Sequence, residues 1–217
     1  MKKYIIISCC LALILGGIAI YHFMPKQETI TSQGLYPLKN KIELINDASV
    51  IIKGTVKKVL PSKWSNPDFK KGENIRNIIQ TDILVDVDDV YKGTPNNTKT
   101  ITVRIDEGTI GDTEMVSDDY PDFIPGEEAI LFLSEDDGDL ANANERYYVL
   151  TCMLQGKFSL KESEGSDKIF ENANRDTLKL SAIKDEIKTT LDSLQKNPIP
   201  KMTKEEIRKQ NEKVFGK

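Results

Sequence analysis

The sequence predicts a mainly β protein: a small curled antiparallel barrel of about five to six strands with flanking helices, preceded by one N-terminal transmembrane helix. Three observations lead to this prediction. Residues 4–23 carry no formal charge when His22 is neutral. Between 50 and 160, short runs of apolar residues are separated by turn-forming Gly, Pro, Asn and Asp. A helical spacing of apolar residues then appears at 177–195.

The N-terminal segment, 1–24, is predicted to be a membrane anchor. Its twenty uncharged residues would span about 30 Å as a helix, the thickness of a bilayer core. Lys2 and Lys3 flank the short N-terminal side, which places that end in the cytoplasm and the rest of the chain outside. We therefore expect a single-pass protein of the cell membrane.

Other interpretations of the same segment remain open. A signal peptide cleaved after the small residues 17–19 would give a secreted protein, although the apolar run continues through Phe23. A lipoprotein would be cut before Cys9, but only four apolar residues precede that position, which are too few for a signal region. A buried soluble helix is the remaining alternative.

The outer part begins with a polar linker at 25–38, which shows no periodicity. Apolar spacing at 39–47 predicts a short amphipathic helix. Three β-branched runs then predict an antiparallel meander with a bend at Gly54. These runs are 50–60, 78–91 and 99–105.

The second half of the expected barrel starts after a long acidic stretch, 106–126, that is predicted to be an irregular loop. The continuous apolar run 129–133 predicts a strand buried on both faces. Two further short strands are expected at 146–150 and 157–160.

A packing helix at 177–195 completes this domain, which we place at 39–195. Pro198 and Pro200 end the helix. The remaining segment, 196–217, is a polar helical tail whose Thr203 and Glu206 have the spacing of a capping box.

Charge is unevenly distributed along the chain, whose formal net charge is -4. Residues 81–145 contain eighteen acidic and three basic side chains, whereas 39–80 contain nine basic and four acidic ones. A strongly acidic barrel would repel phosphate, so nucleic acid is excluded as a partner and cations or basic partners are favoured.

The side-chain inventory argues against an enzyme. The only histidine, His22, lies in the apolar run, so no imidazole remains for Ser-His or Cys-His catalysis. Cys9 and Cys10 lie in the same run, which leaves Cys152 alone outside. Its flanks, 149–154, are typical of a strand, so we interpret Cys152 as a small buried hydrophobe.

Five motifs stand out along the chain: DASVIIKGTV at 47–56, VDDVYKG at 87–93, ITV at 101–103, PGEEAILFL at 125–133 and QGKF at 155–158. Together they resemble those of a family of uncharacterised extracytoplasmic bacterial proteins. The first two also resemble, more distantly, the OB-like barrel of tissue inhibitors of metalloproteinases and netrin-type modules. The resemblance implies that the expected barrel is OB-like. Those inhibitors act through an N-terminal Cys and a disulfide frame that are missing here, so no functional residue is carried over.

Two candidate sites follow from the residues. Trp64 and Phe69, on the predicted loop after the first strand, could anchor a protein partner, or they could fold back onto the core. Acidic residues in two loops could bind Ca²⁺, although a solvated hairpin turn is the favoured interpretation of the second loop. These residues are Asp118, Asp119 and Asp122, and then Asp136, Asp137 and Asp139.

The favoured function is therefore a non-enzymatic binding or interaction module, anchored in the membrane of the bacterial cell envelope. The alternatives are an envelope hydrolase or protease inhibitor, or a Ca²⁺-dependent adhesion or signalling domain. Clustered carboxylates of raised pKa in a concave pocket would favour the enzyme. A well-packed barrel with an exposed Trp64 would favour the module.

Overall fold

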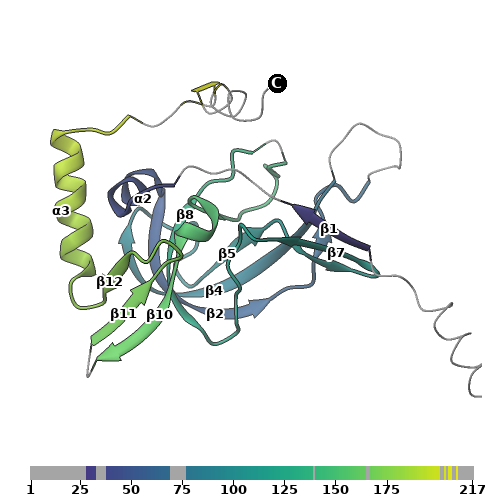
Figure 1. The fold of residues 1–217 in the computed structure, drawn as a ribbon, viewed down its shortest axis with the longest axis horizontal. Helices are drawn as coiled ribbons and strands as arrows, with labels where there is room; N and C mark the ends of the chain where they lie inside the picture. The colour runs from purple at the N-terminus through teal and green to yellow at the C-terminus, as the bar shows by residue number, and fades with distance from the viewer. Residues whose placement is uncertain are drawn as a thin grey trace, which may run out of the picture.

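The computed structural model describes residues 28–32, 38–68, 77–138, 140–164 and 167–200, together with positions 203, 205, 206 and 209. In this part the protein is mainly β, as predicted (Figure 1). It contains two α-helices, α2 (Lys41–Asp47) and α3 (Ile183–Lys196), and one 3₁₀ turn, η1 (Met153–Gly156).

The strands form two sheets. The larger sheet has the order β12-β11-β10-β8-β2-β4-β3, with β5 added to β4 and β9 added to β8. Its strands are β2 (Val50–Val59), β3 (Lys63–Trp64), β4 (Ile79–Lys92), β5 (Thr100–Ile105), β8 (Glu128–Ser134), β9 (Val149–Leu150), β10 (Lys157–Glu164), β11 (Asp167–Glu171) and β12 (Thr177–Lys179). The smaller sheet has the order β1-β7-β6, with β1 (Glu28–Ser32), β6 (Gly108–Ile110) and β7 (Thr113–Ser117).

The predicted meander is confirmed, since β2, β4 and β5 pair in succession and antiparallel. The β2–β4 pairing shifts register three times, once at Lys53/Gly54. A Cβ on Gly54 would lie 2.6 Å from Cγ1 of Val85 and 2.7 Å from the carbonyl oxygen of Asp86. The strand therefore needs glycine here because the backbone of β4 approaches too closely for a side chain.

The predicted barrel is not observed: the two sheets are not closed into a barrel. On the open side, β5 and the residue before β9 meet at one isolated parallel bridge, Val103 with Tyr148. Two backbone hydrogen bonds support this bridge: Arg104 N donates to Tyr148 O (2.8 Å), and Tyr148 N donates to Thr102 O (2.9 Å). The expected strand at 146–150 is reduced to Val149–Leu150, which is too short for a continuous ladder.

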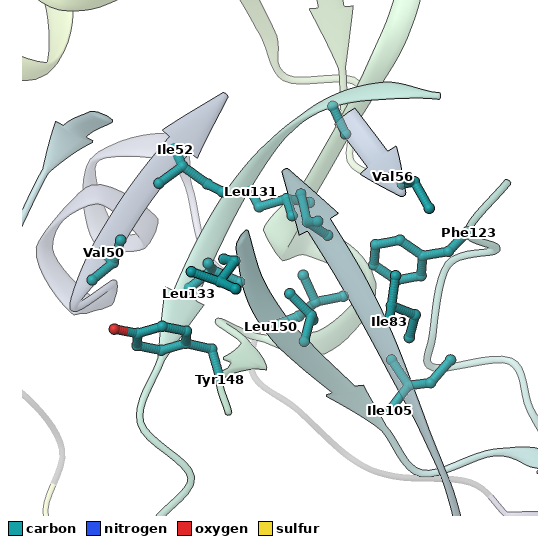
Figure 2. Close-up of a cluster of buried hydrophobic side chains, with 14 residues drawn as sticks. Val50, Ile52, Val56, Ile83, Ile105, Phe123, Leu131, Leu133, Tyr148 and Leu150 are labelled. Atoms are coloured by element: carbon teal, nitrogen blue, oxygen red, sulfur yellow. The ribbon is translucent and has the colours of Figure 1, made fainter. Parts of the chain in front are cut away.

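One core cluster fills the concave side of the curled sheet (Figure 2). It gathers Val50, Ile52 and Val56 of β2 with Ile83, Val85, Ile101, Val103, Ile105, Phe123, Ala129, Leu131, Leu133, Tyr148 and Leu150. A second cluster lies on the other side of β2 and β8. There Ile51, Ile130 and Phe132 pack against α2, α3 and the strands β10–β12.

The position of β8 between these clusters confirms one sequence prediction directly. Leu131 and Leu133 face the first cluster, whereas Ile130 and Phe132 face the second, and all four are fully buried. A strand covered on both faces has no polar side to display, which explains its continuous apolar sequence.

Hydrogen bonds satisfy backbone groups at both ends of α2. Asn40 caps α2, accepting a hydrogen bond from Glu43 N (3.0 Å), while the Glu43 carboxylate accepts one from Asn40 N (2.9 Å). At the other end of α2, the Lys92 ammonium donates to the carbonyl oxygens of Ile45 (2.6 Å), Asn46 (3.1 Å) and Ala48 (2.5 Å).

The predicted start of the packing helix, residue 177, was wrong. Residues 177–179 form β12, which pairs with β11, and α3 begins only at Ile183. Leu178 is nevertheless buried in the second cluster, as are Ile183 and Ile187 of α3. The apolar spacing therefore reflected one core reached by a strand and then a helix.

Three short strands occupy stretches that the sequence predicted to be linker or loop. β1 lies within 25–38, and β6 and β7 lie within 106–126. β1 pairs in parallel with β7 along its whole length, from Glu28 with Thr113 to Ser32 with Ser117. β11, after the hairpin from β10, was also not expected.

The two ends of the chain are described only in part. The predicted anchor, 1–24, lies outside the described residues, and the helices within them are too short or too polar to cross a bilayer. In the tail the capping box is confirmed: Glu206 N donates to the Thr203 hydroxyl (3.2 Å), and Thr203 N donates to the Glu206 carboxylate (2.7 Å).

Candidate functional site

The candidate site is a cavity of about 620 Å³ at one end of the curled sheet. It lies where β2 ends and β4 begins, and the β6–β7 hairpin and the segment at Phe123 form its other walls. Its lining residues are Val59, Leu60, Pro61, Ser62, Thr81, Ile83, Ile105, Glu107, Gly108, Thr109, Ile110, Glu114, Met115, Val116, Asp122 and Phe123. This volume lies within the range of sites for small organic ligands.

The lining combines apolar side chains with acidic ones. Three of the lining residues, Glu107, Glu114 and Asp122, are acidic, and among the described residues around the cavity none that lines it is Lys, Arg or His. Two apolar lining residues, Val59 and Val116, are 38% and 37% exposed. The cavity therefore offers both apolar surface that a ligand could cover and a lining whose charged side chains are acidic.

Glu107 is the most perturbed carboxylate of the cavity. Partial burial raises its pKa to about 7, and the nearby charge of Asp122 adds to the shift, while a backbone hydrogen bond from Ser117 opposes it. The structure shows no ion pair for Glu107 or Asp122 within the residues that it describes. Near neutral pH, Glu107 is therefore poised between its neutral and charged forms.

The ammonium group of Lys157 lies beside the cavity and is engaged with several groups. Lys157 Nζ lies 2.7 Å from the Glu127 carboxylate and 4.7 Å from the centre of the Phe123 ring. Its side chain is almost fully buried. Its ammonium also donates to the carbonyl oxygen of Asp122, so Lys157 fixes the segment at 122–123 while its ion pair is made with Glu127, which does not line the cavity.

The hairpin wall is fastened to the sheet by hydroxyl groups. Thr81 Oγ1 donates to the carbonyl oxygen of Glu107 (2.6 Å), and the Ser62 hydroxyl accepts from Thr109 N (3.2 Å). Between them Gly108 has φ +142°, and a Cβ there would lie 2.2 Å from the Ser62 oxygen. A glycine is therefore required where the hairpin meets the sheet.

A second polar cluster braces the open side of the sheet. The guanidinium of Arg104, on β5, donates to both oxygens of Asp82 (2.7 and 2.9 Å), contacts Glu145, and lies 3.7 Å from the centre of the Tyr147 ring. Lys63 adds ion pairs to Asp82 (3.0 Å) and Glu145 (2.7 Å). The pKa of Asp82 lies below its usual value because these hydrogen bonds outweigh its burial. All its members are paired with one another, so this cluster is interpreted as structural.

Part of the charge segregation seen along the sequence is balanced by ion pairs in space. Lys53 and Lys57 of β2 pair with Asp88 and Asp86 of the adjacent β4, each at 2.9 Å. Lys63 pairs with Asp82 in the same way. Three aspartates of the acidic segment therefore face lysines of the basic segment across neighbouring strands, and the acidic surface is smaller than the count predicted by that much.

The predicted partner-binding aromatic residues are placed as follows. Trp64 lies in β3 and is half-buried against Ile78, Ile79 and Met115. It is therefore folded back onto a small apolar cluster, the alternative that the sequence left open, and its role in binding a partner stays a prediction. Phe69 lies outside the described residues.

Calcium binding by the predicted acidic residues stays a prediction, and the described ones are placed as follows. Asp136 uses one oxygen to accept from Gly138 N (3.0 Å) and the other to accept from the Tyr147 hydroxyl (2.6 Å), as expected for a turn. Asp119 is buried, whereas Asp118 and Asp137 are exposed. Asp139 lies outside the described residues, and among those described no three acidic, His or Cys side chains could hold a metal ion.

Cys152 is half-buried against the second core cluster, in a turn with φ +54°. Burial raises the pKa of its thiol, so the thiolate is disfavoured. This environment agrees with its interpretation as a small hydrophobe, although the expected strand covers only Val149–Leu150.

Sequence reasoning missed the cavity and the role of Glu107 in it. The stretch around Gly108 was interpreted as a barrel loop, and Asp122 was considered only as a calcium ligand. The available signal was a carboxylate directly before a glycine between two short alternating runs.

Comparison of the sequence with protein-family models and with curated proteins finds no match in either.

Proposed function

We propose that the protein is a membrane-anchored, extracytoplasmic binding module of the bacterial cell envelope, non-enzymatic, whose ligand site is the cavity beneath the β6–β7 hairpin. The cavity carries the proposal, because it is large enough for a small organic molecule and combines apolar walls with acidic side chains. The uncharged run at 4–23 and its lysine flank support the anchor and the outward orientation.

An OB-like arrangement is part of this proposal. The order β2-β4-β5 on one side and β9-β8-β2 on the other, joined by the parallel bridge of Val103 and Tyr148, supports it. In OB-type folds the sheet remains partly open, and ligands bind on the sheet and the loops at its rim. The cavity occupies such a rim, between the ends of β2 and β5.

The test uses the full chain in maltoside micelles. A chemically diverse panel of neutral, anionic and cationic small molecules is screened by the shift that each produces in melting temperature. We expect at least one compound class to stabilise the wild type and to lose that effect when Thr109→Phe and Val116→Phe fill the cavity together.

The matched control is Val90→Phe with Thr98→Phe, which adds the same two aromatic rings to exposed positions away from the cavity. This pair should bind like the wild type. A panel in which no compound distinguishes the cavity-filled protein from the control would refute the cavity as the ligand site.

A carboxylate-based hydrolase is the second candidate. It is favoured by one observation, the pKa of Glu107 near 7 beside Asp122 in a concave site, which suits a general acid paired with a charged carboxylate. Turnover of a glycoside or ester panel that Glu107→Gln abolishes, while ligand binding persists, would select the enzyme over the module.

A further inference from the structure

We infer that the cavity takes a small amphipathic amine: a protonated nitrogen held by Glu107 and Asp122, and an apolar body held by the walls at Val59, Ile105 and Met115. This inference rests on the proposed function and adds the chemical class of the ligand. It follows from the two properties that the lining residues combine.

The first property is the sign of the charge. Glu107, Glu114 and Asp122 are the charged lining residues of the described cavity. The neighbouring Lys157 is held by Glu127, the Phe123 ring and the carbonyl oxygen of Asp122, and it does not itself line the cavity. An anionic ligand would meet repulsion from the carboxylates of Glu107 and Asp122, whereas a cation would relieve the repulsion between these two groups.

The second property is the apolar wall. Eight of the sixteen lining residues are Val, Leu, Ile, Met or Phe. Val59 and Val116 remain more than a third exposed, which leaves apolar surface for a ligand to cover. A fully hydrated metal ion or a polyamine without an apolar body would leave this surface in water.

The distribution of hydrogen bonds orients such a ligand. Ser62 and Thr81 are engaged with each other (2.9 Å) and with the backbone of the hairpin. They therefore fasten the hairpin and do not compete for the ligand. The carboxylates lie on the loops at 107 and 122 and on β7, so we expect the amine at the hairpin side and the apolar body toward the core.

Trp64 provides a direct measurement. It is the single tryptophan of the chain and packs against the small cluster of Ile78, Ile79 and Met115, of which Met115 lines the cavity. Its emission is followed while n-hexylamine, 1-hexanol or hexanoate is added to the full chain in maltoside micelles at pH 8. At this pH Glu107 is mostly charged and the amine is protonated.

We expect hexylamine to change the emission with half-saturation on the order of 1 mM, a reasonable value for a probe of this size. Hexanol and hexanoate, which share its apolar chain, should bind at least about tenfold more weakly, because they lack the positive charge. Glu107→Gln and Asp122→Asn should each weaken the amine by about tenfold and leave hexanol unchanged. Added salt should weaken the amine alone.

The matched control is Glu135→Gln, which removes an exposed carboxylate that does not line the cavity and should bind hexylamine like the wild type. Circular dichroism establishes that each variant is folded. Hexanol or hexanoate binding as tightly as the amine, with sensitivity to the cavity-filling pair, would overturn the amine inference and leave the ligand-binding function standing. Amine binding that ignores Glu107→Gln, Asp122→Asn and the cavity-filling pair would also overturn it.

Discussion

Replacing Arg104 with methionine should lower the free energy of unfolding by about 3 kcal/mol at pH 7. The side chain of Arg104 is 2% exposed and makes a bidentate pair with Asp82, whose side chain is 14% exposed. Removing one partner of a buried pair typically costs about 3 to 5 kcal/mol, because the other charge stays buried. The lower end applies, since Lys63 remains 3.0 Å from Asp82.

The assay is denaturant unfolding of the full chain, combined with hydrogen exchange. The amides of Arg104 and Tyr148 form the only hydrogen bonds described across the open side of the sheet between β5 and the residue before β9. In the methionine variant these two amides should exchange faster by a larger factor than those of β8, because the brace beside them is lost.

The pH dependence gives a further check on sign. The pKa of Asp82 is lowered in the folded state, so its contribution is present above its ordinary value of 3.8 and is lost as the pH falls through the folded-state pKa. The difference between wild type and variant should therefore shrink in acid. Adding Asp82→Asn to Arg104→Met should recover about 1 to 2 kcal/mol at pH 7.

A cost below about 1 kcal/mol for Arg104→Met, or no recovery in the double variant, would refute this reasoning. Lys58→Met is the matched control, because Lys58 is an exposed base on β2. It should change the free energy of unfolding by no more than about 0.5 kcal/mol.

Three further predictions concern other regions. Lys92→Met should destabilise the protein by about 2 kcal/mol in urea unfolding, because three carbonyl groups at the end of α2 lose their donor; a cost under 0.5 kcal/mol would contradict this. Glu107→Gln should raise the free energy of unfolding at pH 8 by about 1 to 2 kcal/mol, because it removes a carboxylate whose pKa folding raises from 4.5 to about 7. This figure is about half of the free energy that corresponds to the pKa shift, because the group is partly exposed. The gain should vanish below about pH 4, where Glu107 is neutral in both the folded and the unfolded state. Calcium at millimolar concentration should leave the melting temperature unchanged, since Asp136 is engaged with Gly138 and Tyr147. An increase in melting temperature with calcium but not with magnesium would support the calcium site.

The parts of the fold that could be predicted from sequence are those with a strong local pattern. The meander is specified by alternation within each strand, and β8 by an unbroken apolar run. β1 could not be found because its partner is the distant β7 and its pairing leaves four of its five residues exposed, so no apolar alternation marks it. The start of α3 was misplaced because Leu178 reaches the same core from a strand.

The candidate site was not predictable for a related reason. Its walls come from 59–62, 81–83, 105–116 and 122–123, and only the folded sheet brings these segments together. Charge was misleading as well. A count along the chain cannot detect that Lys53 and Lys57 face Asp88 and Asp86 across adjacent strands.

The parallel pairing of β1 with β7 has a geometric consequence for where a ligand is met. Under the proposed anchor, only residues 24–27 lie between the membrane span and Glu28, a length of at most about 14 Å. β7 is itself a wall of the cavity, and β1 lies alongside it (Figure 1). The site would thus be held close to the lipid headgroups, where amphipathic molecules concentrate. Such a protein would sample its ligand from a two-dimensional membrane-bound pool, and uptake would depend on partitioning into lipid as much as on concentration in the surrounding water.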